Sequence, residues 1–279
     1  MSDVSPLAPP SFPELPSVAG VELATHAAGL RYQKRADLLL ATLSEGTTVA
    51  GTFTKSLCPS APVDWCRRIL NADSPMAGTA RALVVNSGNA NAFTGRAGET
   101  AAELTANTVA ASLGIDPDEI YLASTGVIGE NLPEEALAAE LPLLGSLLSA
   151  SGPDNWPEAA GAIRTTDTFS KGSAASAEVG GITANVVGIA KGSGMIAPDM
   201  ATMLGFVFTD AAVSAAAAQQ LLTESVGGSY NRITVDSDTS TSDTVLLFCT
   251  GALGNEEIVG PESPGYAELG AALHSVNLE

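Results

Sequence analysis

Lys-Gly-Ser-Gly-Met-Ile-Ala-Pro-Asp-Met-Ala-Thr-Met-Leu, residues 191–204, places a threonine directly after a small residue. A glycine-rich approach precedes Thr202, and an apolar run from Met203 to Phe208 follows it. This arrangement suits a chain that cuts itself between Ala201 and Thr202 and then uses the new N-terminal threonine as a nucleophile. A threonine hydroxyl needs an adjacent base, and a freed α-amine with a reference pKa of about 8 supplies one. The simpler interpretation is a loop that runs into a buried strand.

The composition indicates an ordered globular protein. The 279 residues suffice for one large domain or two lobes, and 45% of them are hydrophobic against 15% charged. A net charge of −19 argues against binding to nucleic acid or to an anionic membrane surface. The chain lacks an apolar run of about 18 residues and starts without a secretory signal. We therefore expect a cytoplasmic protein, with residues 1–20 as a flexible, proline-rich lead-in.

Cysteine and histidine usage narrows the chemistry. The spacing of Cys58, Cys66 and Cys249 is unlike that of zinc ligands, so we expect reduced core residues. Only two histidines exist, His26 and His274, near opposite ends of the chain. A Ser-His-Asp triad or a histidine-rich metal site is hard to build from them. Acid–base chemistry is therefore expected from carboxylates, lysine or an α-amine.

Hydrophobic patterning predicts an α/β fold with mixed sheets and packed helices, because strands and helices interleave. Short runs rich in valine, isoleucine and leucine predict strands at 37–41, 48–53, 82–85, 120–123, 182–189, 203–208 and 244–249. Helical spacing of apolar residues predicts helices at 63–70, 98–113, 133–149, 212–226 and 265–278. Pro142 is expected to kink or break the third helix. Residues 151–157 are the predicted internal linker.

Two strand ends carry polar residues suited to binding. Asn86, Asn89 and Asn91 follow one strand and offer amide donors and acceptors, although an ordinary asparagine-rich turn explains them better. Thr125 and Gly126 leave the next strand, and glycine lets a backbone N–H point outward beside the threonine hydroxyl. Such a pair can stabilise an oxyanion, while Ser-Thr-Gly is also a frequent turn.

Further stretches combine hydroxyls with charges. Residues 164–171 and 229–243 each suit either a polar amino-acid substrate or a turn that satisfies its own hydrogen bonds. The second is not a calcium loop, because Thr241 occupies the place that needs glycine and Leu247 the place of the bidentate glutamate. Lys191 precedes its glycines and so belongs to no P-loop. It either neutralises a substrate carboxylate or lies at the surface.

In their order, these motifs resemble the ornithine acetyltransferase (glutamate N-acetyltransferase) family of arginine biosynthesis. Within Thr48 to Phe248, the matching stretches are 86–91, 124–129, 165–168, 191–204 and 231–236. The resemblance implies an N-terminal-nucleophile-like, self-processing acetyltransferase whose proenzyme is cut into an α chain and a β chain beginning at Thr202. Thr202 would take the acetyl group of N-acetylornithine and pass it to glutamate through an acetyl-threonine enzyme, with its α-amine as base.

The resemblance also implies roles for single residues. Thr125 and Gly126 match the oxyanion-hole pair, and Thr165, Lys191 and Thr202 match substrate-binding positions. No cofactor or metal is implied, and acetyl-CoA is a further acetyl donor in some members. Two α and two β chains are expected to form a heterotetramer. The implied regions are a lead-in at 1–20, an α-chain region at 21–201 and the start of a β-chain region at 202–279.

The sequence departs from this family in two ways. Asp199 stands where the family more often has asparagine. Family members are also longer, and their later segment carries an acidic Gly-Glu-Gly-type substrate motif, so we expect a C-terminally incomplete chain. Two alternatives remain open: an N-terminal-nucleophile amidohydrolase or peptidase, in which water takes the acyl group, and an inactive fragment that keeps only ligand binding or dimer contacts.

Overall fold

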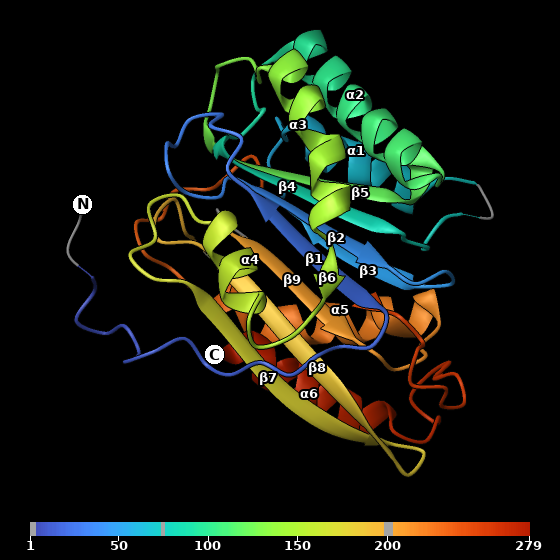
Figure 1. The fold of residues 1–279 in the computed structure, drawn as a ribbon. Helices are drawn as coiled ribbons and strands as arrows, with labels where there is room; N and C mark the ends of the chain where they lie inside the picture. Colours follow the sequence, from blue (N-terminus) through green and yellow to red (C-terminus); the bar gives the residue numbers. More distant parts are fainter. Residues whose placement is uncertain (1–3, 74–75, 198–202) are drawn as a thin grey trace.

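Two mixed five-stranded sheets stack face to face in a computed structural model, which describes residues 4–73, 76–197 and 203–279 (Figure 1). The first sheet has the order β5-β4-β2-β1-β6. Its strands are β1 (Val21–His26), β2 (Leu38–Leu43), β4 (Ala82–Asn89), β5 (Ile120–Val127) and β6 (Ser149–Ala150). Only β4 and β5 run parallel among these pairs, so their carboxyl ends meet at one edge of the sheet.

The second sheet has the order β3-β10-β9-β8-β7. Its strands are β3 (Thr48–Phe53), β7 (Lys171–Val179), β8 (Ile182–Lys191), β9 (Leu204–Thr209) and β10 (Thr244–Cys249). β9 and β10 are parallel, and the other pairs are antiparallel. The first residues of β9 and β10 are therefore neighbours, which decides the geometry of the site below.

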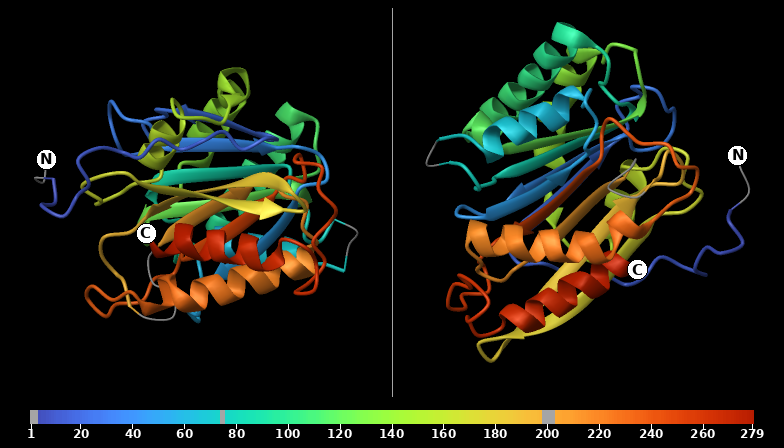
Figure 2. Two further views of the ribbon diagram at one scale, coloured as in Figure 1. Left: turned by 90° about the horizontal axis from the view of Figure 1, so that it is seen from below. Right: turned by 180° about the vertical axis from the view of Figure 1, so that it is seen from behind.

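Helices cover both outer faces of the stacked sheets (Figure 1). The first sheet carries α1 (Ala61–Leu70), α2 (Gly95–Leu113) and α3 (Glu134–Leu147). On the second sheet, α5 (Ala215–Gly228) and α6 (Tyr266–Leu278) run side by side (Figure 2). Short helical segments are α4 (Trp156–Ala162), η1 (Pro117–Glu119) and η2 (Tyr230–Arg232). Within the described ranges, every helix is too short or too polar to cross a lipid bilayer.

An aromatic cluster joins the two sheets. Phe208 of β9 and Phe248 of β10 stack with ring centroids 5.3 Å apart, and Tyr121 of β5 meets Phe248 edge-on at 6.1 Å. Trp156 of α4 contacts Phe208 from the side and is completely buried. Aromatic pairs of this kind add about 0.5–1.5 kcal/mol each beyond the area they bury. The parallel strands that carry the site therefore rest on a rigid core.

The mixed α/β class predicted from the sequence is confirmed, and individual elements differ from the predictions. The helix around Pro142 is continuous from Glu134 to Leu147, so the predicted break is wrong. Burial of Leu137, Leu141 and Leu144 holds this helix together despite the hydrogen bond that proline removes. β1, β7 and α4 had no predicted counterpart.

Three loop and terminal segments also differ from expectation. Cys58 is exposed after β3, so it is not a core residue, whereas Cys66 and Cys249 are buried free thiols as expected. The predicted linker at 151–157 contains the start of α4. Within the predicted lead-in, Leu15 and Val18 are buried between the sheets, because apolar side chains there have a core to enter.

Candidate active site

The backbone of Met203 is fixed on both sides at the start of β9. Asp243 Oδ1 accepts a hydrogen bond from Met203 N at 2.8 Å, and Met203 O accepts one from Thr244 N at 3.1 Å. The next residue, Leu204, pairs with Lys191 of β8 on one side and with Thr244 of β10 on the other. The predicted cleavage residues 201 and 202, and Asp199, lie outside the described residues. The structure thus describes the anchored residue directly after the predicted nucleophile.

Asp243 is a buried carboxyl group with an unusual acidity. It is 0% exposed, and burial raises its pKa to about 7. The hydrogen bond from Met203 and the positive charge of Lys191 lower the pKa and offset part of this rise. Asp243 therefore titrates near neutral pH, beside the start of β9.

Lys191 is the buried cation of the site. It is 2% exposed, and burial lowers its pKa to about 8, while the nearby charges of Asp167 and Asp243 raise it in part. Among the residues that the structure describes, no carboxylate forms an ion pair with its amine. The alternative of a surface lysine is therefore wrong, and the amine retains the capacity to bind an anionic group.

The stretch that contains Thr165 is joined to the end of β8 through Asp167. Asp167 accepts hydrogen bonds from Gly192 N at 2.7 Å, from Lys171 Nζ at 2.5 Å and from Thr165 N at 3.4 Å. Burial raises the pKa of Asp167, but hydrogen bonds from Lys171 and Gly192 outweigh it and lower the pKa overall. This network places the half-buried Thr165 in the same cluster as Lys191.

The predicted motif at 231–236 supports the loop after Lys191. Asp236 accepts hydrogen bonds from Met195 N at 2.7 Å and from Ile196 N at 2.9 Å. The bond from Met195 is the largest cause that lowers the pKa of Asp236. Met195 has a φ of 55°, a backbone angle that non-glycine residues rarely adopt, so the loop depends on this support.

A cavity of about 260 Å³ lies beside this cluster. Its walls come from β7, β8, the loop around Ile196, the turn after α5 and the last turn of α6, with Lys191 and Met203 in the lining. At about 30 Å³ for each water molecule, the space suits a molecule the size of an amino acid. The one strongly buried cation in the lining therefore faces a volume of suitable size.

The predicted oxyanion pair lies at the edge where the parallel strands β4 and β5 end. Thr125 is 3% exposed, whereas Gly126 is exposed, which suits a backbone N–H that points out of the sheet. Ser124 Oγ donates to Asn86 Oδ1, and Asn86 Nδ2 donates to Asn89 O at 2.9 Å. The asparagines are therefore occupied by one another and by the turn, and their part is to hold this strand end.

Hydrogen bonds between loops connect this edge with the start of β9. They join Ala61 N to Asn91 O at 3.1 Å, Ser60 N to Thr241 O at 2.8 Å and Thr54 N to Asp243 O at 3.0 Å. The segment after β3 therefore bridges the loop of the first sheet and the start of β10 in the second. The sequence-predicted motifs meet at one end of the stacked sheets.

We predict that Gly126→Ala destabilises the fold. Gly126 has a φ of 135°, and an added Cβ would lie 2.3 Å from the carbonyl carbon of Gly88, a backbone atom that cannot swing away. Gly129→Ala is the matched control, because Gly129 has a φ of 83° with open space around it. The control should cost about 1–2 kcal/mol in urea unfolding and Gly126→Ala at least about twice as much. Equal losses of unfolding free energy in the two variants would contradict the close approach of Gly126 to the backbone of Gly88.

We predict a pH dependence of stability from Lys191. Its folded pKa of about 8 lies below the 10.5 of the free group, so the unfolded chain binds this proton more tightly. The resulting penalty is complete below about pH 8 and disappears as the pH rises towards 10.5. The free energy of unfolding of the wild type relative to Lys191→Met should grow by up to roughly 3 kcal/mol across this window. If the difference between the two free energies of unfolding, measured in urea, did not change with pH, the lowered pKa of Lys191 would be contradicted.

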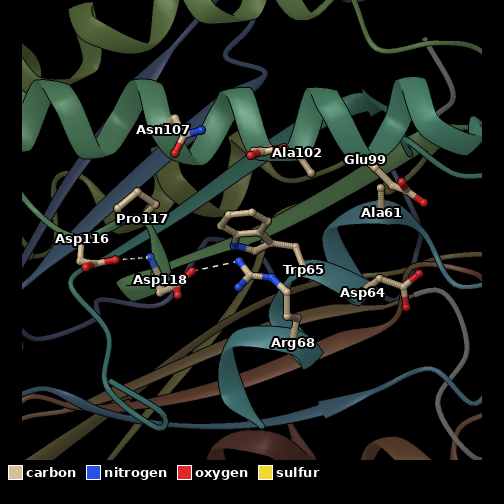
Figure 3. Close-up of a pocket in the computed structure, with 11 residues that line it drawn as sticks. Ala61, Asp64, Trp65, Arg68, Glu99, Ala102, Asn107, Asp116, Pro117 and Asp118 are labelled. Carbon is tan, nitrogen blue, oxygen red and sulfur yellow. Dashed lines mark hydrogen bonds and ion pairs between the residues drawn. The ribbon is translucent and has the colours of Figure 1, made fainter. Parts of the chain in front are cut away.

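A separate pocket of about 620 Å³ lies between α1, α2 and the loop before β5 (Figure 3). Arg68 stacks on the Trp65 indole at 4.3 Å and forms an ion pair with Asp118 at 2.9 Å. The indole N–H donates to Ile120 O. None of the sequence-predicted site residues lines this pocket. Size alone does not make it the active site.

Asp243 lies at the end of the predicted polar stretch 229–243, but sequence reasoning gave it no role of its own. A sequence signal for it exists, since Asp243 directly precedes the buried strand Thr244–Cys249 just as Thr202 precedes the run from Met203. Two parallel neighbours that start at one edge would bring the two positions together. The contact between Asp243 and the start of β9 can be predicted only if β9 and β10 are known to be parallel neighbours, which the sequence pattern does not reveal.

Comparison with known proteins decides the family. The sequence pattern of the ArgJ family matches residues 22–279. This chain belongs to the ArgJ family. The arginine biosynthesis bifunctional protein ArgJ of Nitrobacter winogradskyi is 57% identical over 251 residues, which are 90% of this chain and 59% of that protein. The chain thus spans about 60% of the length of the curated ArgJ relatives it matches.

Solved structures agree with the ArgJ assignment and with the fold. The crystal structure of ornithine acetyltransferase complexed with ornithine from Mycobacterium tuberculosis is 34% identical, with a TM-score of 0.56 over 66% of this chain and 95% of that chain. An L-aminopeptidase D-Ala-esterase/amidase from Ochrobactrum anthropi, described as a variant of the Ntn hydrolase fold, is 11% identical with a TM-score of 0.51. It covers 97% of this chain and 87% of its own. This second likeness shows the fold alone.

Proposed function

We propose that this protein is a self-processing acetyltransferase of arginine biosynthesis. It cuts itself between Ala201 and Thr202 and then moves an acetyl group from N-acetylornithine to glutamate through an acetyl-threonine intermediate. The observation that carries the proposal is the start of β9. There the amide of Met203, the residue bonded to Thr202, is held by buried Asp243 with the cation Lys191 on the neighbouring strand. Membership of the ArgJ family supports the same reaction class.

Cleavage uses the hydroxyl of Thr202 on the peptide bond in front of it. Thr202 Oγ attacks the carbonyl carbon of Ala201, the C–N bond breaks, and an ester links the two residues. Water hydrolyses this ester, which leaves a carboxylate on Ala201 and restores the threonine hydroxyl. The freed α-amine of Thr202 then stands beside its own hydroxyl and acts as general base, because its reference pKa is near neutral.

Acetyl transfer follows in two steps. Thr202 Oγ attacks the acetyl carbonyl carbon of N-acetylornithine, and its proton passes through the α-amine to the departing amine of ornithine. The α-amine of glutamate then attacks the acetyl ester, the C–O bond to Thr202 breaks, and the proton lost by the glutamate amine passes through the α-amine of Thr202 to restore its hydroxyl. The Thr125 hydroxyl and the Gly126 N–H stabilise the oxyanion in both steps, each donor being worth a few kcal/mol. Kinetics of the ping-pong type are the expected consequence.

Substrate recognition is assigned to the cluster on the second sheet. The ammonium of Lys191 binds the substrate carboxylate, and Thr165, held through Asp167, contributes a hydroxyl. Acetyl-CoA is proposed as a second donor, and two α and two β chains as the assembly. Replacement of N-acetylornithine by acetyl-CoA in the same assay tests the donor, and the absence of N-acetylglutamate would limit the enzyme to the first donor.

Mass and product analysis test the proposal on protein expressed from its complete reading frame. Intact-mass measurement should give two species that divide between Ala201 and Thr202. Incubation with N-acetylornithine and glutamate should then give N-acetylglutamate and ornithine. A single uncut mass would overturn self-processing. Release of acetate irrespective of glutamate would instead identify an amidohydrolase, in which water takes the acetyl group.

A further inference from the structure

We infer that Asp243 is a positioning residue of this centre: its carboxyl group holds the peptide unit that joins Thr202 to β9. The inference rests on the proposed function, because it gives Asp243 a purpose only where Thr202 performs chemistry. It gives a specific role to a residue that belongs neither to the predicted oxyanion pair nor to the substrate positions Thr165, Lys191 and Thr202. Asp243 acts indirectly, through the backbone N–H of Met203, and does not itself touch the substrate.

The geometry of one hydrogen bond carries the inference. Met203 N, which donates to Asp243 Oδ1 at 2.8 Å, is the nitrogen of the peptide bond between Thr202 and Met203. A peptide unit is planar, so a restraint on its N–H fixes the plane of that peptide bond at Met203. β-Pairing holds the residue behind it, since Leu204 lies between Lys191 and Thr244. Met203, the residue that follows the predicted nucleophile, is thus fixed on both sides.

The surroundings of Asp243 give that support its rigidity. Thr54 N donates to Asp243 O at 3.0 Å, and Thr54 Oγ1 donates to Ser240 O at 2.5 Å. The side chain is completely buried, so water does not compete for the acceptor. The buried ammonium of Lys191 provides a favourable charge across the strand. Among the described residues, Oδ2 of Asp243 has no hydrogen-bond partner, so the bond from Met203 to Oδ1 and the charge of Lys191 offset only part of the cost of burying this carboxyl group.

The other end of β9 offers a matched control in Asp210. This carboxyl group is 5% exposed and accepts a hydrogen bond from Asn185 N at 2.9 Å, so it also restrains a backbone N–H. It follows Thr209, the last residue of β9, whereas Asp243 acts before the first. With about 3.3 Å for each residue, a strand of six residues separates the two sites by roughly 20 Å. Loss of either bond removes similar support from the fold, but only Asp243 adjoins Thr202.

Three variants in the protein from its complete reading frame test the inference: Asp243→Ala, Asp243→Asn and Asp210→Ala. Asp243→Ala should slow cleavage and reduce kcat per cleaved protein about 100-fold, with KM changed less than about twofold, because a misplaced group lowers the chemical step. Asp243→Asn keeps an oxygen that accepts from Met203 N, so it should stay within about tenfold of the wild type. Asp210→Ala should keep kcat within about twofold at a comparable loss of thermal stability.

The kcat values of these variants separate a positioning role of Asp243 from a purely structural one. Equal kcat in Asp243→Ala and Asp210→Ala would reduce Asp243 to a structural residue and overturn the inference, while the proposed function stands. If Asp243→Asn lost as much kcat as Asp243→Ala, the negative charge of Asp243 and not its hydrogen bond to Met203 would be what matters. That result would also overturn the inference. If Asp243→Ala does not fold, Asp243→Val, which fills the space without an acceptor, takes its place with the same expectation. A wild type that neither cleaves nor transfers would refute the proposed function, and the inference falls with it.

Discussion

Thr202→Ala is expected to abolish both chain cleavage and acetyl transfer. The two reactions share one hydroxyl, so its loss stops the attack on Ala201 and the attack on the acetyl donor together. Without cleavage, the α-amine that serves as base also stays in a peptide bond. Intact-mass measurement should give one uncut species, and the assay with N-acetylornithine and glutamate should give no N-acetylglutamate above background.

Thr202→Ser is the matched control for this variant. Serine keeps a hydroxyl and, after cleavage, the α-amine, so both reactions should continue at a reduced rate. If Thr202→Ala still transferred acetyl groups, another nucleophile would be responsible. If it were still cut at the same bond, the cleavage would come from a contaminating protease.

Thr125→Val is expected to lower kcat by about 10²–10³-fold, the usual effect of one lost oxyanion-hole donor. Valine matches the shape of threonine and lacks only the hydroxyl. Because Thr125 is 3% exposed and lies within β5, its shape matters for packing, and this variant preserves it. Steady-state assays on the cleaved protein should show the loss mainly in kcat, with KM within about threefold, since the bond strengthens in the transition state.

Thr125→Ser provides the control for the oxyanion donor. It restores the hydroxyl and removes a methyl group, so kcat should recover to within about tenfold of the wild type, at some loss of stability. A Thr125→Val enzyme with wild-type kcat would leave the Gly126 N–H as the acting donor. Equal losses in both variants would point to packing at the end of β5.

The regular elements with strong patterns were predictable from the sequence. The strands 48–53 and 244–249 have the predicted bounds, because each is a short run rich in β-branched and other apolar residues. β10 is buried along its whole length, whereas β3 at the edge of the sheet buries only Val49 and Ala50. β7 escaped prediction because Lys171–Val179 contains mostly alanine and serine between its charged residues, which have little intrinsic strand preference. α4 escaped because it has only seven residues. Tertiary packing around Trp156, which no local pattern encodes, decides this short helix.

The site was predictable as motifs and not as contacts. Thr125 and Gly126 lie at a strand end as expected, and Lys191 ends β8. The burial of Lys191 was not predictable, because it depends on strands and loops distant in the sequence. The contact of Asp243 with Met203 requires the parallel register of β9 and β10, which joins residues 40 positions apart. Register of this kind is a property of the whole sheet.

Mass analysis of the acetylated enzyme tests the central claim most directly. Cleaved protein is incubated with N-acetylornithine in the absence of glutamate, digested and analysed for the peptide that begins at Thr202. The account predicts one acetyl group as an ester on the hydroxyl of Thr202, which disappears when glutamate is added and reappears as N-acetylglutamate. A peptide that stays unmodified while N-acetylglutamate still forms in the complete assay would contradict Thr202 as the acetyl carrier.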